Sequence, residues 1–380
     1  MLRCFRYKLR PTKAQKKLLQ KHLSDLCWLY NKCIETIKVA YEAQQPYPSR
    51  NGLNKLIKLW MVEKPELRNI HSQVLQNVCD RVDKAFKAFF RRVKAGETPG
   101  YPRFKSWQSY KSFTYPQSGF SLKDGILKLS KLGKLRVNYH RELRGIIKTC
   151  TLKRDAVGDY WVTFATEVDK EPLMPSTAVV GIDFGLKDLV TLDDGTKFPA
   201  PKYYRMLEKS LAKAQRKLSK LDKKSKAYIK QQIIVAKIHR KITNQRHNYT
   251  HQLSSYLVKN YGTIIHEDLD LRQLIAKNYA KSWHDAAVGL LTSQITYKAE
   301  SAGRNCIGVN PAYTSQKCSS CGQLVPKDLS VRTHQCSCGY IADRDVNAAK
   351  NIKRLGLQSL KELGSTSLLL FRSPHLQVGV

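Results

Sequence analysis

The sequence predicts an α/β protein in two parts: a small β-barrel that carries an inserted helical region, and a domain built on a mixed β-sheet. Residues 5–10 alternate apolar and basic side chains, which is the period of a half-buried strand. Two long segments within residues 11–95 repeat apolar residues at helical spacing. Farther along, the short apolar runs 179–182 and 263–266 each lead into an acidic residue. Such runs are typical of buried strands in sheets that contain parallel pairs.

The helical region begins after a capping-box pattern at Thr12 and Gln15. Apolar side chains then recur at alternating spacings of four and three residues, at Leu19, Leu23, Leu26, Tyr30, Cys33 and Ile37. A second apolar series stops before Gly96 and Pro99, and it consists of Leu75, Val78, Val82, Phe86, Phe89 and Val93. We therefore expect residues 11–95 to be mainly helical.

Aromatic and basic residues are interleaved between residues 101 and 115. Nucleobases stack on aromatic faces while Lys and Arg bind phosphates, so Arg103, Lys105 and Tyr110 are candidate nucleic-acid contacts. The alternative is an aromatic strand edge with solvated charges. Short strand-like runs follow, at 126–129, 135–137, 146–152 and 160–168. Together with the first strand they predict the barrel.

The net charge constrains the partner of the protein. The chain has 67 Lys and Arg against 30 Asp and Glu, a formal net charge of +37, which predicts a polyanionic partner. Hydrophobic residues make up 42% of the chain, which is too many for a disordered basic tail. No apolar run approaches the roughly 20 residues of a transmembrane helix, and the N-terminus lacks the apolar core of a signal peptide. We expect a cytoplasmic protein without membrane contact.

Positive charge is concentrated in residues 202–250, which hold 15 Lys and Arg against two acids. An apolar stripe at helical spacing predicts a helical hairpin there, with the stripe packed on the rest of its domain and a cationic outer face. Because the charges are of one sign, phosphate contact is favoured over a merely solvated face. The candidate contacts are Lys213, Arg216, Lys217, Lys220, Arg240 and Arg246.

Three acidic residues stand in positions where an acid is costly unless it has a partner. Asp183 ends the first apolar run, Glu267 ends the second, and Asp345 lies in the first turn of a predicted helix that ends at Gly356. Brought together by the mixed sheet, the three carboxylates could hold two divalent cations. Mg²⁺ is the natural choice for an all-oxygen site that cleaves phosphodiesters. The alternative is that each acid pairs with one of the many basic side chains.

Four of the ten cysteines are clustered with the spacing of a metal site. Two residues separate Cys318 from Cys321, one separates Cys336 from Cys338, and a glycine follows each pair. Four thiolates at this spacing predict one structural, tetrahedral Zn²⁺ ion. The short second pair leaves His334 as an alternative ligand in place of one cysteine. The other six cysteines have no ligand-like spacing, and we expect them to behave as small buried apolar residues.

The order of these motifs resembles one protein family. GIDFG, IIHED, TSQKCSSCG with its second cysteine pair, and ADRDVNAAKNI follow one another as in TnpB, a transposon-encoded RNA-guided nuclease related to type V CRISPR effectors. The start RYKLRPTKAQ and the aromatic–basic stretch near Tyr101 extend the resemblance over nearly the whole chain. In one departure, the family's ribbon often has two residues between the last two cysteines, whereas this chain has one.

The resemblance implies both an architecture and a set of site residues. Asp183, Glu267 and Asp345 would be the catalytic, Mg²⁺-binding acids, and Asp345 is preferred to Asp343 because it begins the D-x-N-A-A stretch. The implied domains are a wedge β-barrel at 1–10 and 100–175, a helical recognition domain at 11–99, a RuvC-like nuclease domain of RNase H-like fold at 176–313 and 341–356, a zinc ribbon at 314–340, and a C-terminal tail at 357–380.

The resemblance also implies an activity and its partners. A noncoding guide RNA from the transposon end would select double-stranded target DNA, the protein would read a short motif beside the target, and one RuvC-like site would cut in the prokaryotic cytoplasm or nucleoid. No protein partner is indicated. Three alternatives are an RNA-independent transposase or resolvase, a nuclease-inactive RNA-guided DNA-binding repressor, and a zinc-ribbon RNA-binding protein without chemistry. The presence of all three acids argues against a repressor, and the third alternative leaves those acids unexplained.

Overall fold

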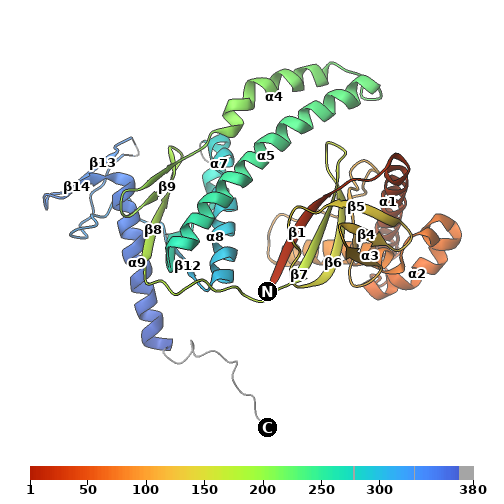
Figure 1. The fold of residues 1–380 in the computed structure, drawn as a ribbon, viewed down its shortest axis with the longest axis horizontal. Helices are drawn as coiled ribbons and strands as arrows, with labels where there is room; N and C mark the ends of the chain where they lie inside the picture. Colours follow the sequence, from red (N-terminus) through yellow and green to blue (C-terminus); the bar gives the residue numbers. More distant parts are fainter. Residues whose placement is uncertain (277–278, 329, 368–380) are drawn as a thin grey trace, which may run out of the picture. The chain divides into compact units, whose positions relative to one another are not determined.

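The computed structural model describes residues 1–276, 279–328 and 330–367, and the chain divides into two compact units. The first unit is Met1–Asp169 and the second begins at Lys170 (Figure 1). Each unit is built around its own β-sheet and its own hydrophobic core. Among the described residues, no helix is long and apolar enough to cross a membrane. Residues 368–380, which belong to the predicted C-terminal tail, lie outside the described ranges.

The sheet of the first unit has seven strands in the order β2-β6-β7-β1-β5-β4-β3, and all neighbours pair antiparallel. The strands are β1 (Leu2–Leu9), β2 (Ser112–Tyr115), β3 (Phe120–Lys123), β4 (Ile126–Leu129), β5 (Gly133–Asn138), β6 (Ile146–Arg154) and β7 (Tyr160–Glu167). Phe5, Tyr7 and Leu9 are buried, as their alternation predicts. Hydrogen bonds do not close this sheet within the described residues, because its end strands β2 and β3 each pair with one neighbour.

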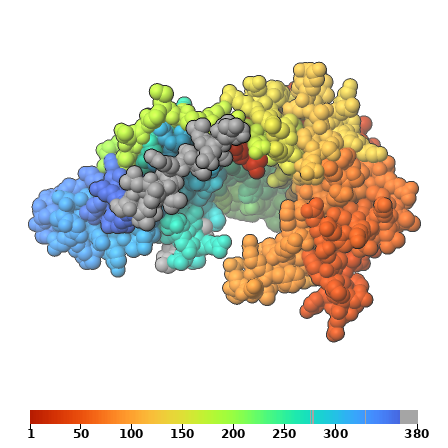
Figure 2. All heavy atoms as spheres, turned by 90° about the horizontal axis from the view of Figure 1, so that it is seen from below, coloured from red at the N-terminus to blue at the C-terminus, as the bar shows by residue number. Residues whose placement is uncertain are grey.

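The helical region predicted for residues 11–95 is confirmed, and it lies between β1 and β2 in the chain. It comprises α1 (Lys13–Glu42), α2 (Arg50–Glu63), a short 3₁₀ helix (Pro65–Asn69) and α3 (Ser72–Lys94). The capping box forms: the backbone N–H of Gln15 donates to the Thr12 hydroxyl, and that of Thr12 donates to the Gln15 side chain. Buried residues of these helices and of the sheet form one core, and Figure 2 shows the helices, red to orange, lying against the strands, in yellow.

The second unit has the predicted mixed sheet, in the order β10-β9-β8-β11-β12. Its strands are β8 (Val179–Phe184), β9 (Asp188–Leu192), β10 (Lys197–Pro199), β11 (Thr263–Glu267) and β12 (Asn305–Val309). The first three in the chain pair antiparallel, whereas β11 runs parallel to both β8 and β12. Parallel pairing needs long connections, and helices supply them here.

Helices cover both faces of this sheet (Figure 1). On one face, residues of α5 (Lys226–Asn260) and α8 (Val288–Ala302) share a core with Val180, Ile182 and Ile264. On the other face, Ile352 of α9 (Arg344–Ser367) packs with Ile265 and Val309. Alternate residues of β8 and β11 therefore face opposite helical layers, as the pleat of a strand requires. The shorter helices α6 (Leu271–Ala276) and α7 (Ala280–Ala286) lie between β11 and α8 in the chain.

Helix α9 does not end at Gly356, so the helix end predicted at that residue is wrong. The helix continues to Ser367 and takes up residues 357–367 of the predicted tail. The glycine is needed for close packing: a Cβ added at Gly356 would lie less than 3.0 Å from the Ile265 side chain of β11. A Cβ at Gly181 of β8 would collide in the same way with the carbonyl oxygen of Ala349 in α9.

The segment 202–250 forms the predicted helical hairpin, but its apolar stripe packs differently from our expectation. The hairpin consists of α4 (Tyr203–Ser219) and α5, joined by a short turn. The two helices pack on each other, and the buried Gln231 side chain donates to the Ala214 carbonyl at 2.9 Å. Ile229, a member of the stripe, stays 53% exposed, so the expectation that the whole stripe packs on the rest of the domain is wrong.

We predict that Gly356→Ala destabilises the second unit by about 1–3 kcal/mol, because the added methyl group has to displace Ile265 or α9. Calorimetric unfolding of the full chain measures this. The matched control is Gly52→Ala in α2, where the nearest atom to the new Cβ would be 3.6 Å away. That change should be neutral or stabilising by up to about 1 kcal/mol. Equal effects of the two substitutions would contradict tight α9–β11 packing.

Candidate active site and metal centre

The structure brings the three predicted acids to one corner of the second unit. β8 and β11 are parallel neighbours in which Ile182 pairs with His266, so Asp183 and Glu267 follow at adjacent strand ends. Asp183 shares the strand face of Gly181, and Glu267 shares that of Ile265; α9 packs on this face. Asp345 lies in the first turn of the same helix. Parallel strands put their carboxyl ends at one edge, which is why acids so distant in sequence meet.

Burial disfavours the charged forms of Asp183 and Glu267. Burial, followed by the nearby charges of Glu267 and Asp345, raises the pKa of Asp183 well above its usual range. Burial also raises the pKa of Glu267, while the hydroxyl of Thr314, which donates to Glu267 Oε1, acts in the opposite direction. A cluster of carboxyl groups with raised pKa values is an arrangement that a bound cation would stabilise.

Basic side chains hold the acids at the start of α9. Arg344 Nη2 lies 3.0 Å from Asp345 Oδ1, and Lys197 Nζ lies 2.7 Å from Asp343 Oδ2. Asp343 also caps the helix, since its Oδ1 accepts from the backbone N–H groups of Asp345 and Val346. Asp343 thus has a local structural role. Asp345 acts more strongly than Asp343 on the pKa of Asp183.

The donor set of the acids fits a hard cation such as Mg²⁺, because the carboxylates of Asp183, Glu267 and Asp345 offer only oxygen atoms. Within the described ranges, however, the four cysteines are the group of side chains placed closely enough to hold a metal ion as they stand. The three acids do not form such a group there. The carboxylate of Asp345 contacts Arg344.

The four predicted cysteines form a compact cluster. Their sulfur atoms all lie within 4.8 Å of one another, with Cys318 and Cys338 at 3.8 Å and Cys321 and Cys336 at 3.6 Å. A tetrahedron with metal–sulfur bonds of about 2.3 Å has sulfur–sulfur edges of about 3.8 Å, so the geometry fits zinc. The backbone N–H of Cys338 lowers the pKa of Cys336 to about 7, which favours the thiolate that a metal needs.

The surroundings of the cysteines explain two further sequence features. Gly322 and Gly339, which follow the cysteine pairs, have φ angles of +81° and +85°, a region that favours glycine. His334, the alternative ligand, lies on β13 (Thr333–Gln335) opposite β14 (Ile341–Asp343) and outside the four-sulfur group. Its Nδ1 contacts the Lys327 ammonium, and its ring packs near Tyr340.

Sequence reasoning missed the side chains that connect the cysteine cluster to the acids. Asn347 accepts from the backbone N–H of Ser319 and donates to the Lys317 carbonyl, at 2.9 and 2.8 Å. Asn351, one turn farther along α9, donates to the carbonyls of Thr314 and Lys317. Both Asn side chains are buried. The sequence did contain a signal for these contacts, namely two Asn residues four apart within an apolar helical stripe. Buried amides need hydrogen-bond partners, so the two Asn residues predict polar contacts with another segment.

Comparison with known proteins identifies the family. Residues 162–277 match a family model described as "Probable transposase", 289–352 one described as "Cas12f1-like, TNB domain", and 1–46 a "Helix-turn-helix domain". A protein of Streptomyces pristinaespiralis named "Putative RNA-guided DNA endonuclease" is 34% identical over 93% of this chain and 89% of its own length. The chain belongs to the TnpB family. The expected resemblance is thereby confirmed.

Other relatives agree with TnpB membership, and one solved structure shares the fold. InsQ of Escherichia coli K12, which has the same descriptive name, is 30% identical over 93% of this chain and 92% of its own. The TnpB-like protein L79 of Acanthamoeba polyphaga mimivirus is 26% identical over 92% of this chain and 72% of its own. A Cas12f1–sgRNA–target DNA complex, 15% identical, covers 90% of this chain and 83% of its own with a TM-score of 0.59, which shows a shared fold.

The predicted cationic contacts of this TnpB chain separate into two groups. Lys213, Arg216, Lys217 and Lys220 are exposed on α4. Arg246 instead binds within the unit: its Nη2 lies 2.9 Å from Oδ1 of Asp285, whose carboxylate also accepts from the first backbone N–H groups of α4. Asp285 is 4% exposed, so this ion pair fixes the base of the hairpin. Arg240 is half-buried on α5 and also makes an interaction.

The aromatic–basic stretch of the first unit also divides by exposure. Tyr110 is 4% exposed and packs against Tyr30, so its ring is covered and not available for a base to stack on. Lys105 is tied to this site, with its Nζ 4.3 Å from the centre of the Tyr30 ring. Arg103 is exposed. The exposed aromatic rings of the stretch are those of Tyr101, Phe104 and Trp107.

Proposed function

We propose that this protein is an RNA-guided DNA endonuclease of transposon origin that cuts double-stranded DNA at one metal-dependent site. The observation that carries the proposal is the meeting of Asp183, Glu267 and Asp345, from two parallel strand ends and a helix start, at one sheet edge. Family membership supports the reaction class, since the relatives InsQ and the Streptomyces protein have names that state it. The strand order, with β8–β10 antiparallel and β11 and β12 parallel, supports an RNase H-like nuclease domain.

In the proposed mechanism, Asp183, Glu267 and Asp345 would hold two Mg²⁺ ions, which would supply an activated water and stabilise the leaving oxygen of the scissile phosphate. Thr314 fixes the Glu267 carboxylate by its hydroxyl, and Asp343 caps α9 so that the turn carrying Asp345 keeps its place. Arg344 contacts the Asp345 carboxylate and balances its charge.

The partners follow from charge and family. A guide RNA from the transposon end and the target DNA are both polyanions, which suits a chain with a net charge of +37. Base pairing with the guide would select the target, and the first unit, in the role of wedge and recognition domains, would read the adjacent duplex motif. The cysteine cluster would hold one structural Zn²⁺ ion that fixes the ribbon on α9.

We predict that Asp183→Ala, Glu267→Ala and Asp345→Ala each lower the cleavage rate by about 10³-fold or more, because each removes a metal ligand. Guide and target binding should persist, since the scaffold is unchanged. Single-turnover cleavage and binding assays with the guide complex measure both. Asp343→Asn is the matched control, because Asn keeps the side-chain oxygen that caps the helix and Asp343 holds no metal in this proposal. Near wild-type cleavage by the Asp345 variant, with loss in the Asp343 variant, would reassign the ligand.

We expect one zinc ion per chain, lost when Cys318, Cys321, Cys336 or Cys338 is replaced by Ser, because a closed site needs all four thiolates. Elemental analysis of the purified full-length protein measures occupancy. His334→Ala and Cys306→Ser should both retain zinc, since neither residue belongs to the sulfur cluster. Full occupancy in Cys338→Ser together with loss in His334→Ala would make histidine the fourth ligand.

Each of Lys213→Ala, Lys217→Ala and Lys220→Ala should reduce the slope of log K against log salt for guide RNA by up to about 0.7–0.9, one phosphate contact each. A salt series of equilibrium binding measures the slope. Arg246→Met is the control: it should leave the slope unchanged but destabilise the second unit, because it leaves Asp285 buried and unpaired. Unchanged salt slopes would mean that these lysines face solvent and do not contact phosphates. An altered preference for the motif beside the target would mean that the hairpin takes part in recognising the DNA.

A further inference from the structure

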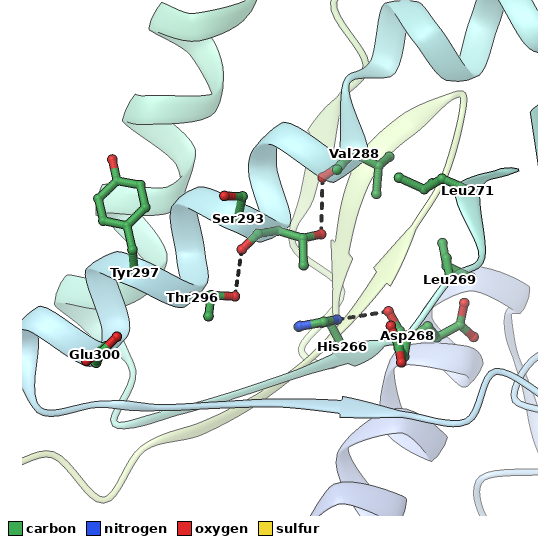
Figure 3. Close-up of a pocket in the computed structure, with 12 residues that line it drawn as sticks. His266, Asp268, Leu269, Leu271, Val288, Ser293, Thr296, Tyr297 and Glu300 are labelled. Carbon is green, nitrogen blue, oxygen red and sulfur yellow. Dashed lines mark hydrogen bonds between the residues drawn. The ribbon is translucent and has the colours of Figure 1, made fainter. Parts of the chain in front are cut away.

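A cavity beside the proposed catalytic edge has no role in the chemistry described so far. Its volume is about 460 Å³, within the range of small-ligand sites. It lies between the end of β11 and helix α8, on the face of the sheet opposite α9 (Figure 3). Glu267 belongs to its lining, so a group bound there lies next to the proposed metal ligands.

The imidazole of His266 is the buried polar group of this cavity. Its side chain is 6% exposed and packs near the ring of Phe184. Its Nδ1 lies 2.8 Å from the Glu267 carbonyl oxygen. A carbonyl can only accept, so in the neutral ring Nδ1 carries the proton and Nε2 is an acceptor. Figure 3 shows this second nitrogen pointing into the space between β11 and α8.

Most of the other polar groups of the cavity wall can accept hydrogen bonds. Thr292 and Thr296 on α8 use their hydroxyl hydrogens within the helix, donating to the Val288 and Thr292 carbonyls at 3.1 and 2.9 Å. Asp268 adds a carboxylate, and Glu300 adds a second one that pairs with Lys170 at 3.6 Å. The hydroxyls of Ser293 and Tyr297 can donate as well as accept. Acceptors therefore outnumber hydroxyl donors in the polar wall.

This wall selects the chemistry of the occupant. A phosphate group has acceptor oxygens and a negative charge, so the carboxylates and acceptors repel it. Leu269, Leu271 and Val288 form an apolar surface in the same cavity, which suits a flat ring. A nucleobase with an exocyclic amino group, which adenine, cytosine and guanine have, combines a flat apolar face with at least two N–H donors, whereas thymine has a single N–H donor on its ring.

We propose that the cavity between β11 and α8 is a nucleobase subsite that takes an amino-bearing base, in preference to thymine, from the strand being cut. This inference rests on the proposed endonuclease function. The strand would cross the sheet edge with its scissile phosphate at Asp183 and Glu267 and a neighbouring base turned toward His266. Single strands expose their bases for such contacts, because no pairing has to be broken.

The first test measures base preference at the cut. After the cut sites of the guide complex have been mapped, targets that differ only in the bases flanking the cut are compared. We expect wild type to favour adenine or cytosine over thymine at one flanking position by about two- to tenfold, the effect of one hydrogen bond. His266→Phe keeps a ring against Phe184 and should abolish the preference. His266→Gln restores an acceptor and should recover it.

A second variant keeps the test independent of packing around His266. Asp268 is exposed, and Asp268→Asn replaces an acceptor with an amide that can donate. This change should shift the flanking preference toward thymine. Thr36→Val is a control, because the Thr36 hydroxyl bonds within its own helix, far in sequence from this cavity. This substitution should leave the flanking preference unchanged. Equal rates for all flanking bases in wild type, or a preference that His266→Phe leaves intact, would overturn the subsite.

A binding measurement separates failure of the subsite from failure of the endonuclease function. Equilibrium binding of dA, dC and dT homo-oligonucleotides of equal length to the full chain is compared between wild type and His266→Phe, without any cleavage. A dA or dC advantage over dT that His266→Phe removes supports the subsite even if the protein cuts nothing. Identical affinities for the three oligonucleotides in wild type, or an advantage for dT, contradict it whether or not cleavage occurs.

Discussion

The close seating of α9 on the sheet of the second unit is the constraint on which the rest of that unit depends. Gly181 on β8 and Gly356 on α9 have no Cβ at two points where the helix and the sheet touch. A Cβ at Gly181 would collide with the backbone of α9, and a Cβ at Gly356 would collide with Ile265 of β11. The same helix begins with the capping carboxylate of Asp343 and carries Asp345 in its first turn. Two buried Asn side chains, Asn347 and Asn351, bind the segment that leads into the cysteine cluster. One helix thus positions an acid of the candidate site and the ribbon together.

Electrostatics explains why the acidic corner persists in so basic a chain. Asp183 and Glu267 are driven toward neutrality by burial, while Asp345 and Asp343 each contact a basic side chain. Neither ion pair is a strong source of stability, because desolvation offsets much of the attraction in the partly buried Arg344–Asp345 pair and solvent screens the more exposed Lys197–Asp343 pair. The positions of these acids are therefore better explained by the proposed catalytic role than by a contribution to folding stability. The proposed two-cation site would remove the repulsion among them.

The two faces of the sheet edge would divide the work of the proposed reaction. Glu267 and His266 are adjacent in the chain, yet the pleat turns Glu267 toward α9 and His266 toward α8. One face gathers carboxylates that suit cations and phosphate. The other face offers acceptors and apolar side chains that suit a base. A strand that crossed this edge would meet both environments, which the pairing of β11 with β8 places side by side.

The hairpin shows how far charge patterning can be interpreted. Its exposed cations follow from an amphipathic pattern that is local to each helix. Its base depends on Asp285, which caps the first turn of α4 and pairs with Arg246 of α5. The number of cations in the hairpin predicts that Arg246 contacts nucleic acid, but in the structure Arg246 pairs with the buried carboxylate of Asp285. Burial of the partner, which a sequence does not display, decides between the two roles.

The sequence by itself determined the features that depend on neighbours in the chain. The capping box at Thr12, the alternation in β1 and the four-cysteine spacing are local, and each appears as predicted. The mixed sheet followed from two apolar runs that end in acids. The sequence pattern alone thus predicted two of the candidate acids at strand ends and the third at a helix start. An acid directly after a buried strand is unusual, because an unpaired buried charge is costly.

Only the tertiary structure decided the features that depend on contacts between distant segments. It packed Tyr110 against Tyr30 and paired Arg344 with Asp345. It placed Gly356 inside α9, where the missing Cβ leaves room for Ile265 of β11. It also brought His266 and α8 around one cavity. Packing partners lie tens to hundreds of residues apart in sequence, so local propensity carries no information about them. Their geometry is fixed only when the layers of the sheet and its helices are assembled.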